Sequence, residues 1–358
     1  MLNNIKIKNF RNFETFKTEF SEKINLIIEP NGSGKTNFLE AIYLSVFGTS
    51  FKTISSSEDF IKKGNEECFV STEWNDSIDR IDFSFSKKSA RSFKLNSKKV
   101  PRKKFLGVSS LVLFAPHSVD ITGGEPAVRR RDLDDYLRLL YEPYNSLLSS
   151  YTKVLKNRNA VIKAIREHNA EKKQLLFWSE KLAELAEKIR ELRGHFFCEI
   201  MPFVKLNTEK LYHSVKGLEI KYLPNVNNVS FFDKYQENVE KEIIVGKTLY
   251  GTHKDDYTFL FFEDESDREK KNLRHHGSRG QQRVGSFLFK VAQFDLLKQK
   301  KGKGAIFLID DIMSELDEQH RIQIAEFIIQ LEAQTFLTGP DVKEIPQSLQ
   351  INSNRIKI

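Results

Sequence analysis

The stretch from Ile24 to Asn37, INLIIEPNGSGKTN, constrains the fold of this chain more than any other. The apolar run at its start is typical of a short buried strand, and apolar residues after Asn37 recur at helical spacing. Between them, glycines allow the backbone to turn tightly and to approach a ligand without a Cβ in the way. The sequence therefore predicts a strand, a glycine-containing loop and a helix in direct succession.

A loop of this kind binds the phosphates of a nucleotide, because its N–H groups and the helix N-terminus point inward. A lysine at the position of Lys35 reaches the β- and γ-phosphates, and the Thr36 hydroxyl ligates Mg²⁺. The fuller pattern has glycine where this chain has Glu29, so turnover is a separate question from nucleotide binding. The predicted nucleotide-binding residues of the loop are Glu29, Pro30, Asn31, Gly32, Ser33, Gly34, Lys35, Thr36 and Asn37.

Composition limits the classes of protein to which the chain can belong. With 358 residues, 39% of them hydrophobic, it can bury a sizeable core in two or more lobes. The net charge of +8 suits a polyanionic partner without identifying one. Cys68 and Cys198 lie far apart with no C-x-x-C spacing, so neither a disulfide framework nor a zinc site is indicated. No apolar run has the length of a signal peptide core or a membrane span, so we expect a cytoplasmic protein.

The segments around the loop predict β-structure. Alternation of apolar and polar residues from Ile5 to Phe20 predicts two strands joined by a turn that contains Arg11 and Asn12. Similar alternation in residues 68–74, 81–85 and 91–95 predicts an antiparallel meander beside the nucleotide.

The pattern changes at Tyr144 to that of long helices. Apolar residues recur alternately three and four positions apart in residues 147–165 and again in residues 178–196. The polar stretch 167–174 separates the two series, so the simplest arrangement is an antiparallel helical hairpin. Arg158 interrupts the first series and is expected to find an acidic partner or an exposed edge. Such an arm would act as a lever or a partner-binding lobe.

The C-terminal third carries the second half of the candidate site. The motif GSRGQQR, from Gly277 to Arg283, opens a helix and places backbone donors at another anion-binding helix N-terminus. The hydrophobic strand 305–309 then ends in Asp310 and Asp311. Because adjacent buried acids repel each other unless a cation binds, we expect one to hold Mg²⁺ and the next to polarise an attacking water.

His253, in the motif GTHKDD, has two aspartates close by in the sequence. A lone histidine in this setting is more often a hydrogen-bonded structural residue, and a role as a general base is the alternative.

Taken together, these segments resemble the RecF family of bacterial recombination-repair proteins, within the SMC-like class of ATP-binding-cassette (ABC) ATPases. The resemblance extends over almost the whole chain. The segments occur in the family's order and are KNFRNF, GSGKTNFLEAIYL, LNSKKVPRKKFLG, LFAPHSVDITGGEPAVRRRDLDDYL, YTKVLKNRN, WSEKLAELA, GTHKDD, GSRGQQR, AIFLIDD and SELD.

The resemblance implies an α/β fold: an ABC-type P-loop ATPase head, with a mixed sheet, helices and an antiparallel β meander, and an inserted α-helical hairpin lobe. The expected division places the N-terminal part of the head, with the P-loop, in residues 1–142 and the helical arm in residues 143–215. Residues 216–358 would form the C-terminal part of the head, with the signature motif, the Walker B strand and the D-loop.

The resemblance also implies roles for individual residues. Lys35 and Asp311 would be catalytic, and Thr36 and Asp310 would bind Mg²⁺. Thr338 lies where transporter-type cassettes carry a switch histidine, and a threonine at this position suits the RecF family.

In such proteins two heads dimerise with ATP between them, so the signature motif of one subunit would contact the γ-phosphate held by the other. Asp317 would be the D-loop residue that crosses the dimer, and Arg11 and Asn12 would lie beside the nucleotide base. The signature residues are Ser278, Arg279, Gly280 and Gln281.

The implied function is that of an ATP-dependent DNA-binding protein in recombinational repair, in repair of replication forks and gaps, and in the SOS response. ATP and Mg²⁺ would close a homodimer on duplex, gapped or junction DNA. Slow DNA-dependent ATP hydrolysis would release it, and the mediators RecR and RecO would assist recombinase loading. Two alternatives stay open: a non-hydrolysing, nucleotide-gated structural clamp, which Glu29 favours, and the ATPase subunit of a transporter.

Overall fold

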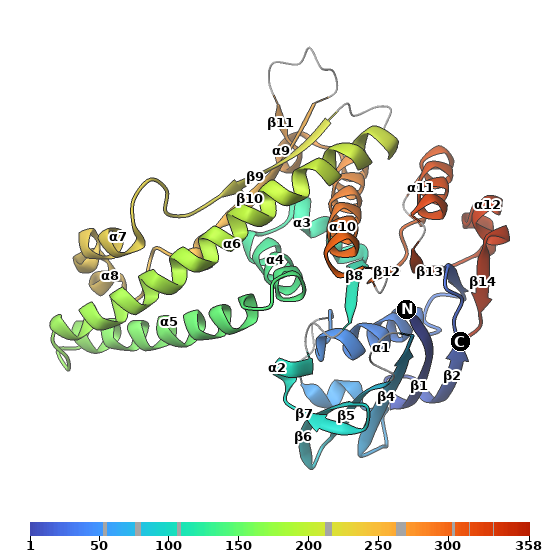
Figure 1. Ribbon diagram of the computed structural model, residues 1–358, viewed down its shortest axis with the longest axis horizontal. Helices are drawn as coiled ribbons and strands as arrows, with labels where there is room; N and C mark the ends of the chain where they lie inside the picture. The colour runs from blue at the N-terminus through green and yellow to red at the C-terminus, as the bar shows by residue number, and fades with distance from the viewer. Residues whose placement is uncertain are drawn as a thin grey trace.

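The computed structural model describes residues 1–52, 56–75, 80–105, 109–211, 217–262, 270–302, 305–314, 316–331 and 333–358. Glu315 of the SELD motif lies outside these ranges. Figure 1 shows a head that contains the large sheets and a helical arm that projects from one side of it. Both ends of the chain lie in the head.

A five-stranded parallel sheet forms the centre of the head, in the order β14-β3-β13-β12-β8. Its inner strands are buried along their whole length, which explains the continuous apolar run of β12. The strands β3 and β13 are equally buried but also carry the polar side chains Asn25, Gln334, Thr335 and Thr338. The strands are β3 (Ile24–Ile28), β8 (Ser110–Phe114), β12 (Ala305–Ile309), β13 (Gln334–Gly339) and β14 (Ser353–Ile356).

Helices α1 (Lys35–Phe47) and α10 (Arg279–Lys301) pack against this sheet. The strands β3, β13 and β12 are neighbours and run in the same direction, so their carboxyl ends meet at one edge of the sheet. The phosphate loop follows β3, Thr338 lies near the end of β13, and the two acids follow β12. Parallel topology therefore gathers at one edge residues as far apart in the sequence as Gly32 and Thr338.

A separate antiparallel sheet covers the other side of α1, in the order β2-β1-β4-β5-β6-β7. The predicted hairpin and meander are confirmed, and Arg11 forms part of the first turn with a φ of 54°. The strands are β1 (Leu2–Phe10), β2 (Phe13–Glu19), β4 (Glu67–Trp74), β5 (Arg80–Ser86), β6 (Ser89–Leu95) and β7 (Lys98–Val100).

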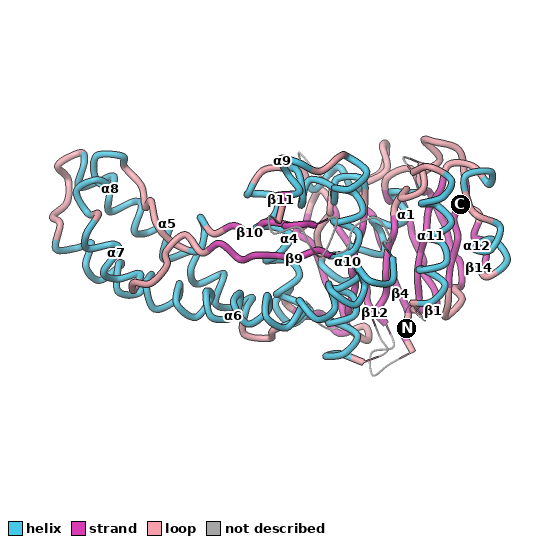
Figure 2. Tube along the Cα trace, turned by 90° about the horizontal axis from the view of Figure 1, so that it is seen from above, coloured by secondary structure: helices cyan, strands magenta, loops and turns pink. Residues whose placement is uncertain are grey.

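The arm consists of α5 (Tyr144–Arg166) and α6 (Lys173–Leu211), which pack against each other as the predicted antiparallel pair. Two short helices, α7 (Phe231–Glu237) and α8 (Val239–Val245), pack on α6 and α5 (Figure 2). Residues that follow the hairpin by about 20 positions in the sequence thus return to the arm.

Arg158 of α5 is fully buried and has the acidic partner that the sequence led us to expect. Its Nη2 lies 2.7 Å from Glu242 of α8, its Nε donates to Ser179 of α6, and its Nη1 donates to Thr248. The guanidinium also stacks over the ring of Tyr235 at 4.5 Å. One buried cation therefore holds α5, α6, α7 and α8 together.

A second buried arginine, Arg193 of α6, fixes the arm to the head. It lies 2.8 Å from both Asp134 of α4 (Pro126–Leu140) and Asp255. Asp255 also accepts a hydrogen bond from Tyr222. Asp255 of GTHKDD is thus a structural anchor, and beside it His253 contacts the Tyr151 hydroxyl at 2.7 Å, as expected for a structural histidine.

The remaining elements connect these parts. A three-stranded antiparallel sheet, β11-β10-β9, lies at the base of the arm. No helix in the described ranges is long and apolar enough to span a membrane. The elements are β9 (Gly217–Leu223), β10 (Asp256–Phe262), β11 (Lys271–Asn272), α2 (Arg102–Phe105), α3 (Asp120–Gly123), α9 (Leu273–His276), α11 (Glu318–Gln330), α12 (Gln347–Ile351), and the 3₁₀ turns Ser57–Phe60, Pro116–Val119, Thr252–Lys254 and Val342–Glu344.

Candidate functional site

The phosphate loop has the conformation that its glycines predict. Gly32 has a φ of 87°, and Gly34, the residue before α1, has a φ of 113°. A Cβ at position 34 would lie 2.3 Å from the amide nitrogen of Asn12. Only glycine satisfies both the left-handed backbone and this close contact, so Gly34 fixes the entry of the loop into α1.

Glu29 does not strain the loop. Its φ is not among the positive values of the described residues, so a Cβ fits the backbone where the fuller motif has glycine. Its carbonyl and that of Pro30, 3.0 Å away, both accept hydrogen bonds from the Lys35 ammonium. The side chain at position 29 is therefore compatible with the geometry of a phosphate loop.

A cavity of about 220 Å³ lies at the carboxyl edge of the parallel sheet. Its lining joins two distant segments that the sequence predicts to form one site. The lining residues are Asn31, Gly32, Gly34, Lys35, Thr36, Asn37, Asp310 and Asp311.

Asp310 is the acid that faces the loop. One of its oxygens accepts a hydrogen bond of 2.9 Å from Thr36, and the other accepts one of 2.7 Å from Thr338 on β13. Burial raises the pKa of Asp310, against the opposing effect of these two hydroxyls, and the neighbouring Asp311 raises it further. A cation at this position would relieve the cost of the buried charge.

The residues present fit Mg²⁺. The Thr36 hydroxyl and the Asp310 carboxylate offer two adjacent oxygen ligands, and Mg²⁺ commonly takes one or two protein oxygens together with waters and substrate phosphates. Within the described ranges, no group of three or more His, Cys, Asp or Glu side chains is arranged to hold a metal alone. Waters and the phosphates of a nucleotide would complete the coordination shell.

Asp311 has a different environment from Asp310. Its φ of 50° is unusual for a residue other than glycine, and its N–H donates to the Thr338 hydroxyl at 3.0 Å. Its carbonyl accepts a hydrogen bond of 2.7 Å from Arg283 on α10. Its Oδ1 is buried and has no hydrogen-bond partner among the described residues. The strained backbone and the unpaired oxygen are features of a carboxylate held for function.

Arg283 and Glu40 contact predicted site residues, Asp311 and Arg11, and were not themselves among the predicted site residues. Arg283 lies in the second turn of the signature helix. Its place shortly after Ser278 in the sequence could have indicated that it belongs near the other site residues. Glu40 is fully buried on α1 and forms ion pairs with Arg11 and Lys52. A lone acid on the apolar side of a predicted helix was the signal in that case.

Arg11 and Asn12 contact different parts of the loop and of α1. Arg11 binds Glu40 through two hydrogen bonds of 3.0 and 2.7 Å and does not line the cavity. Asn12 donates to the Ser33 carbonyl and accepts from the Asn37 amide. Asn12 thus contacts the phosphate loop directly, whereas Arg11 contacts the helix behind it.

The signature motif lies at the exposed start of α10, outside the cavity. The Ser278 hydroxyl accepts from the Gln281 N–H, and the Gln281 side chain accepts from the Ser278 N–H, which forms a capping box. Ser278, Arg279 and Gly280 are all exposed. Asp317 is also exposed, at the start of α11, where it caps the helix through the His320 N–H.

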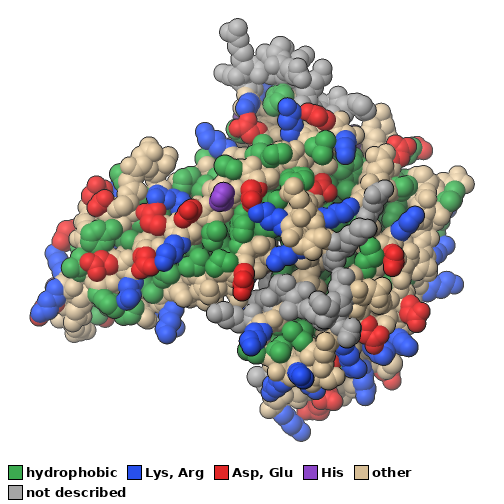
Figure 3. Space-filling model, viewed as in Figure 1, with side chains coloured by type: hydrophobic (Ala, Val, Ile, Leu, Met, Phe, Trp, Pro, Cys, Tyr) green, Lys and Arg blue, Asp and Glu red, His purple; other side chains and the backbone are tan. Residues whose placement is uncertain are grey.

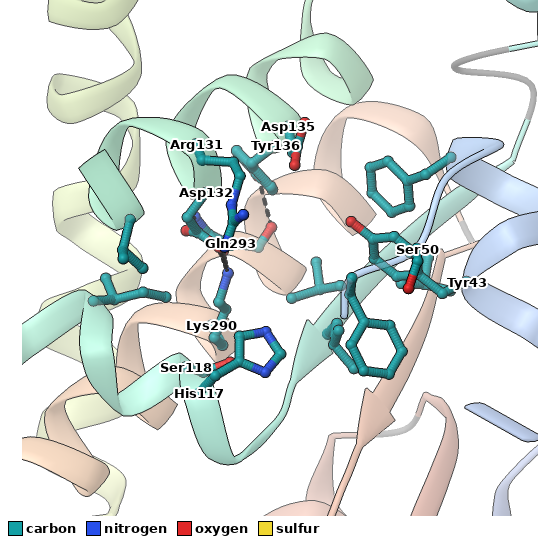
Figure 4. Close-up of a pocket in the computed structure, with 17 residues that line it drawn as sticks. Tyr43, Ser50, His117, Ser118, Arg131, Asp132, Asp135, Tyr136, Lys290 and Gln293 are labelled. Atoms are coloured by element: carbon teal, nitrogen blue, oxygen red, sulfur yellow. Dashed lines mark hydrogen bonds and ion pairs between the residues drawn. The ribbon is translucent and has the colours of Figure 1, made fainter. Parts of the chain in front are cut away.

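A second cavity, of about 100 Å³, lies between α1, α4 and α10 (Figure 4). Its polar groups are largely satisfied within the chain: Lys290 binds Asp132, and the Tyr136 hydroxyl donates to the Gln293 carbonyl at 2.7 Å. Burial lowers the pKa of His117, which favours its neutral form. None of the predicted site residues belongs to the described lining of this cavity.

Comparison with known proteins places this geometry in a family. Residues 1–345 match the family model described as RecF/RecN/SMC N terminal domain. The chain is 30% identical over 359 residues to the DNA replication and repair protein RecF of Lachnoclostridium phytofermentans, with 99% of this chain and 97% of that protein covered.

Solved structures show the same fold. The structure of the recombination mediator protein RecF-ATPrS in the RecFOR pathway has a TM-score of 0.87 and 26% identity, covering 100% of this chain and 96% of that chain. An SmcHead bound to the C-winged helix domain of ScpA has a TM-score of 0.59 at 15% identity, covering 99% and 93%, which supports the fold alone. The predicted ABC-type ATPase head and the predicted resemblance are confirmed. The chain therefore belongs to the RecF/RecN/SMC N-terminal domain family, and its relatives within that family are RecF proteins.

Proposed function

We propose that this chain is an ATP-dependent DNA-binding protein of recombinational repair. The observation that carries the proposal is the cavity in which Lys35, Thr36 and Asp310 converge from two distant segments. Its relatives are named for DNA replication and repair, and a similar structure is that of a RecF bound to an ATP-type nucleotide.

In this proposal the loop N–H groups and Lys35 bind the β- and γ-phosphates. On nucleotide binding, Lys35 exchanges the loop carbonyls that it now contacts for phosphate oxygens. Thr36 and Asp310 hold Mg²⁺, which when bound neutralises charge on the phosphates. Asp311 orients the attacking water through its unpaired buried oxygen, and slow hydrolysis follows.

ATP is proposed to join two copies of the chain. The exposed signature motif supports this, because an anion-binding helix N-terminus lies outside the cavity of its own subunit. A Cβ at Gly280 would meet nothing in its own chain closer than the Ser278 hydroxyl at 3.8 Å. A glycine there is therefore explained by close approach of a phosphate from a second copy. Asp317 would contact the same dimer interface.

The proposed cycle follows from this geometry. ATP closes the homodimer on duplex, gapped or junction DNA, hydrolysis opens it, and RecR- and RecO-type mediators assist recombinase loading. Contacts with DNA would be mainly to phosphates, so affinity should fall steeply with salt.

Light scattering tests the proposal directly. The mass of the purified protein is measured with and without ATP and Mg²⁺ for the wild type, Lys35→Met and Lys153→Met, an exposed control lysine on α5. We expect ATP-dependent doubling for the wild type and the control but not for Lys35→Met. A wild type that binds ATP and stays monomeric would overturn the dimer, and a wild type that binds no ATP would overturn the proposal as a whole.

A further inference from the structure

Most of the net positive charge of the chain lies in one stretch. Residues 76–105 contain ten Lys and Arg residues and three Asp residues, a net charge of +7 out of +8 for the whole chain. In the described part, this stretch forms β5, β6, β7 and α2, at one edge of the antiparallel sheet. Figure 3 shows Lys and Arg side chains on the lobe in which Figure 1 draws these strands. Such a concentration of charge is typical of a surface for a polyanion.

The exposed lysines concentrate on the hairpin of β6 and β7. Its turn is formed by Asn96 and Ser97, whose φ values of 48° and 66° belong to a type I′ turn. Lys94 and Lys99 pair directly across the two strands and share one face of the hairpin, whereas Lys98 pairs with Leu95 and so belongs to the opposite face. We call Lys94, Lys98 and Lys99 the hairpin lysines.

Within the described residues, none of the hairpin lysines forms an ion pair. Asp82 pairs directly with Lys94 across β5 and β6, but its carboxylate is buried and binds Arg80 at 2.8 Å. Asp76 and Asp79 lie outside the described residues. Among the residues that the structure describes, no carboxylate lies within the 4.0 Å of an ion pair from a hairpin lysine or from the exposed Lys104. These cations therefore face solvent.

Two arginines of the same stretch have structural roles instead. Arg91 donates to the Gly48 carbonyl at 3.3 Å, and Arg102 donates to the Phe47 carbonyl at 3.2 Å. Both hold the carboxyl end of α1, where cations interact favourably with the helix dipole. Because α1 begins at Lys35, these contacts attach β6 and α2 to the helix that follows the phosphate loop.

Protection of a sheet edge is the other explanation for lysines at this place, since a charged edge strand resists pairing with another sheet. It accounts for Lys98 and Lys99 on β7, the edge strand. It does not account for Lys94, which lies one strand further in, or for Lys104, which lies beyond the strand on α2.

We propose that the hairpin lysines, Lys94 and Lys99 on one face and Lys98 on the other, form with Lys104 a basic surface around the hairpin that binds the phosphates of duplex DNA. This inference rests on the proposed function and names the part of the head that contacts the nucleic acid. Exposed lysines contact phosphates rather than base edges, and a duplex is common to the duplex, gapped and junction DNA of the proposed function. The surface would supply affinity rather than sequence preference.

The test compares salt dependence of duplex binding, measured by fluorescence anisotropy with ATP and Mg²⁺ present. The variant is Lys94→Gln, Lys98→Gln, Lys99→Gln, and the control is Lys153→Gln, Lys156→Gln, Lys205→Gln, three exposed arm lysines with the same change of charge. Three lost phosphate contacts should reduce the slope of log K against log salt by about 2.7. Between 50 and 200 mM salt, the wild type should lose about 40-fold more affinity than the variant.

Each other outcome overturns the inference in a distinguishable way. If the wild type binds duplex and the hairpin variant keeps its slope, or if the control loses as much, the surface is wrong and the proposed function stands. If the wild type binds no duplex, both fall. Polyglutamate serves as a second probe in the same assay. If the hairpin variant loses polyglutamate binding but keeps duplex binding, the surface binds an acidic protein. If the variant aggregates and its slope is unchanged, the lysines protect the sheet edge. ATP-dependent doubling of mass in the variant verifies that it is folded.

Discussion

The Thr36 hydroxyl donates a hydrogen bond of 2.9 Å to Asp310, although 274 positions separate the two residues in the chain. The other oxygen of the same carboxylate accepts from Thr338. The start of α1 and the ends of β12 and β13 thus meet at one buried acid. This contact places two candidate Mg²⁺ ligands side by side.

Asp310→Asn should weaken Mg²⁺-dependent ATP binding by at least about tenfold, because the amide carries no charge to offset that of the metal. Stability should change little, since the substitution keeps the shape and removes a buried charge. ATP affinity measured across a Mg²⁺ titration checks this, with Glu318→Gln as an exposed acidic control. An unchanged Mg²⁺ dependence would exclude Asp310 as a ligand.

Asp311→Asn should reduce ATP turnover by at least about 100-fold and leave ATP binding and the ATP-dependent dimer intact. The reason is that the substitution replaces the charged carboxylate, with its unpaired oxygen, by a neutral amide. The residues that contact the nucleotide phosphates are unchanged. Phosphate release in a single turnover is the measurement. Equal rates for the two proteins would favour the non-hydrolysing clamp.

Gly280→Ala separates contacts within one chain from contacts across the dimer. The nearest atom to a Cβ at this position is 3.8 Å away, so the monomer should keep its melting temperature and its ATP affinity. ATP-dependent doubling of mass should disappear, because the methyl group would occupy the space of the partner's phosphate. Doubling at wild-type ATP concentrations would contradict the trans contact.

Arg158→Met should lower the stability of the arm by about 3 to 5 kcal/mol, because Glu242 would remain as a buried, unpaired charge. Adding Glu242→Leu should recover most of that loss, since a well-packed apolar pair can replace a buried ion pair. Calorimetry of both variants measures the effect. A double variant no more stable than the single one would argue against the ion pair as the cause.

His253 should make stability dependent on pH. Burial lowers its pKa from 6.5 to about 4, with Lys254 acting in the same direction. As the pH falls, His253 of the unfolded chain binds a proton before that of the folded chain does. The free energy of unfolding should therefore fall by on the order of 3 kcal/mol between about pH 6.5 and pH 4. The melting temperature of the wild type should therefore fall more steeply over this range than that of His253→Gln. Parallel curves would show that the pKa of His253 is the same in the folded and the unfolded state.

Several features of the site could be predicted because they are local. Gly32 and Gly34 permit backbone angles that the loop needs, whatever surrounds it. Ser278 and Gln281 satisfy each other's N–H groups within one helical turn, so the start of α10 is encoded in four residues. The apolar strand before Asp310 likewise follows from its own composition.

Other features depended on contacts between distant segments. Arg11 was expected beside the nucleotide base, and the structure brings it to Glu40 on the helix behind the loop. Whether it also contacts a nucleotide stays a prediction. Arg283 reaches the carbonyl of Asp311 only because α10 packs along the parallel sheet. The residues that return to the arm as α7 and α8 showed no pattern that linked them to it.

The sequence by itself determined the strand, loop and helix at Lys35, the capped start of the signature helix, and the strand that ends in two acids. These depend on backbone angles and hydrogen bonds within a few residues. Only the tertiary structure decided that Arg283 reaches the carbonyl of Asp311, and that Lys94 of β6 and Lys99 of β7 lie opposite each other. Strand order and register fix those relations, and they depend on the free energy of packing the whole core.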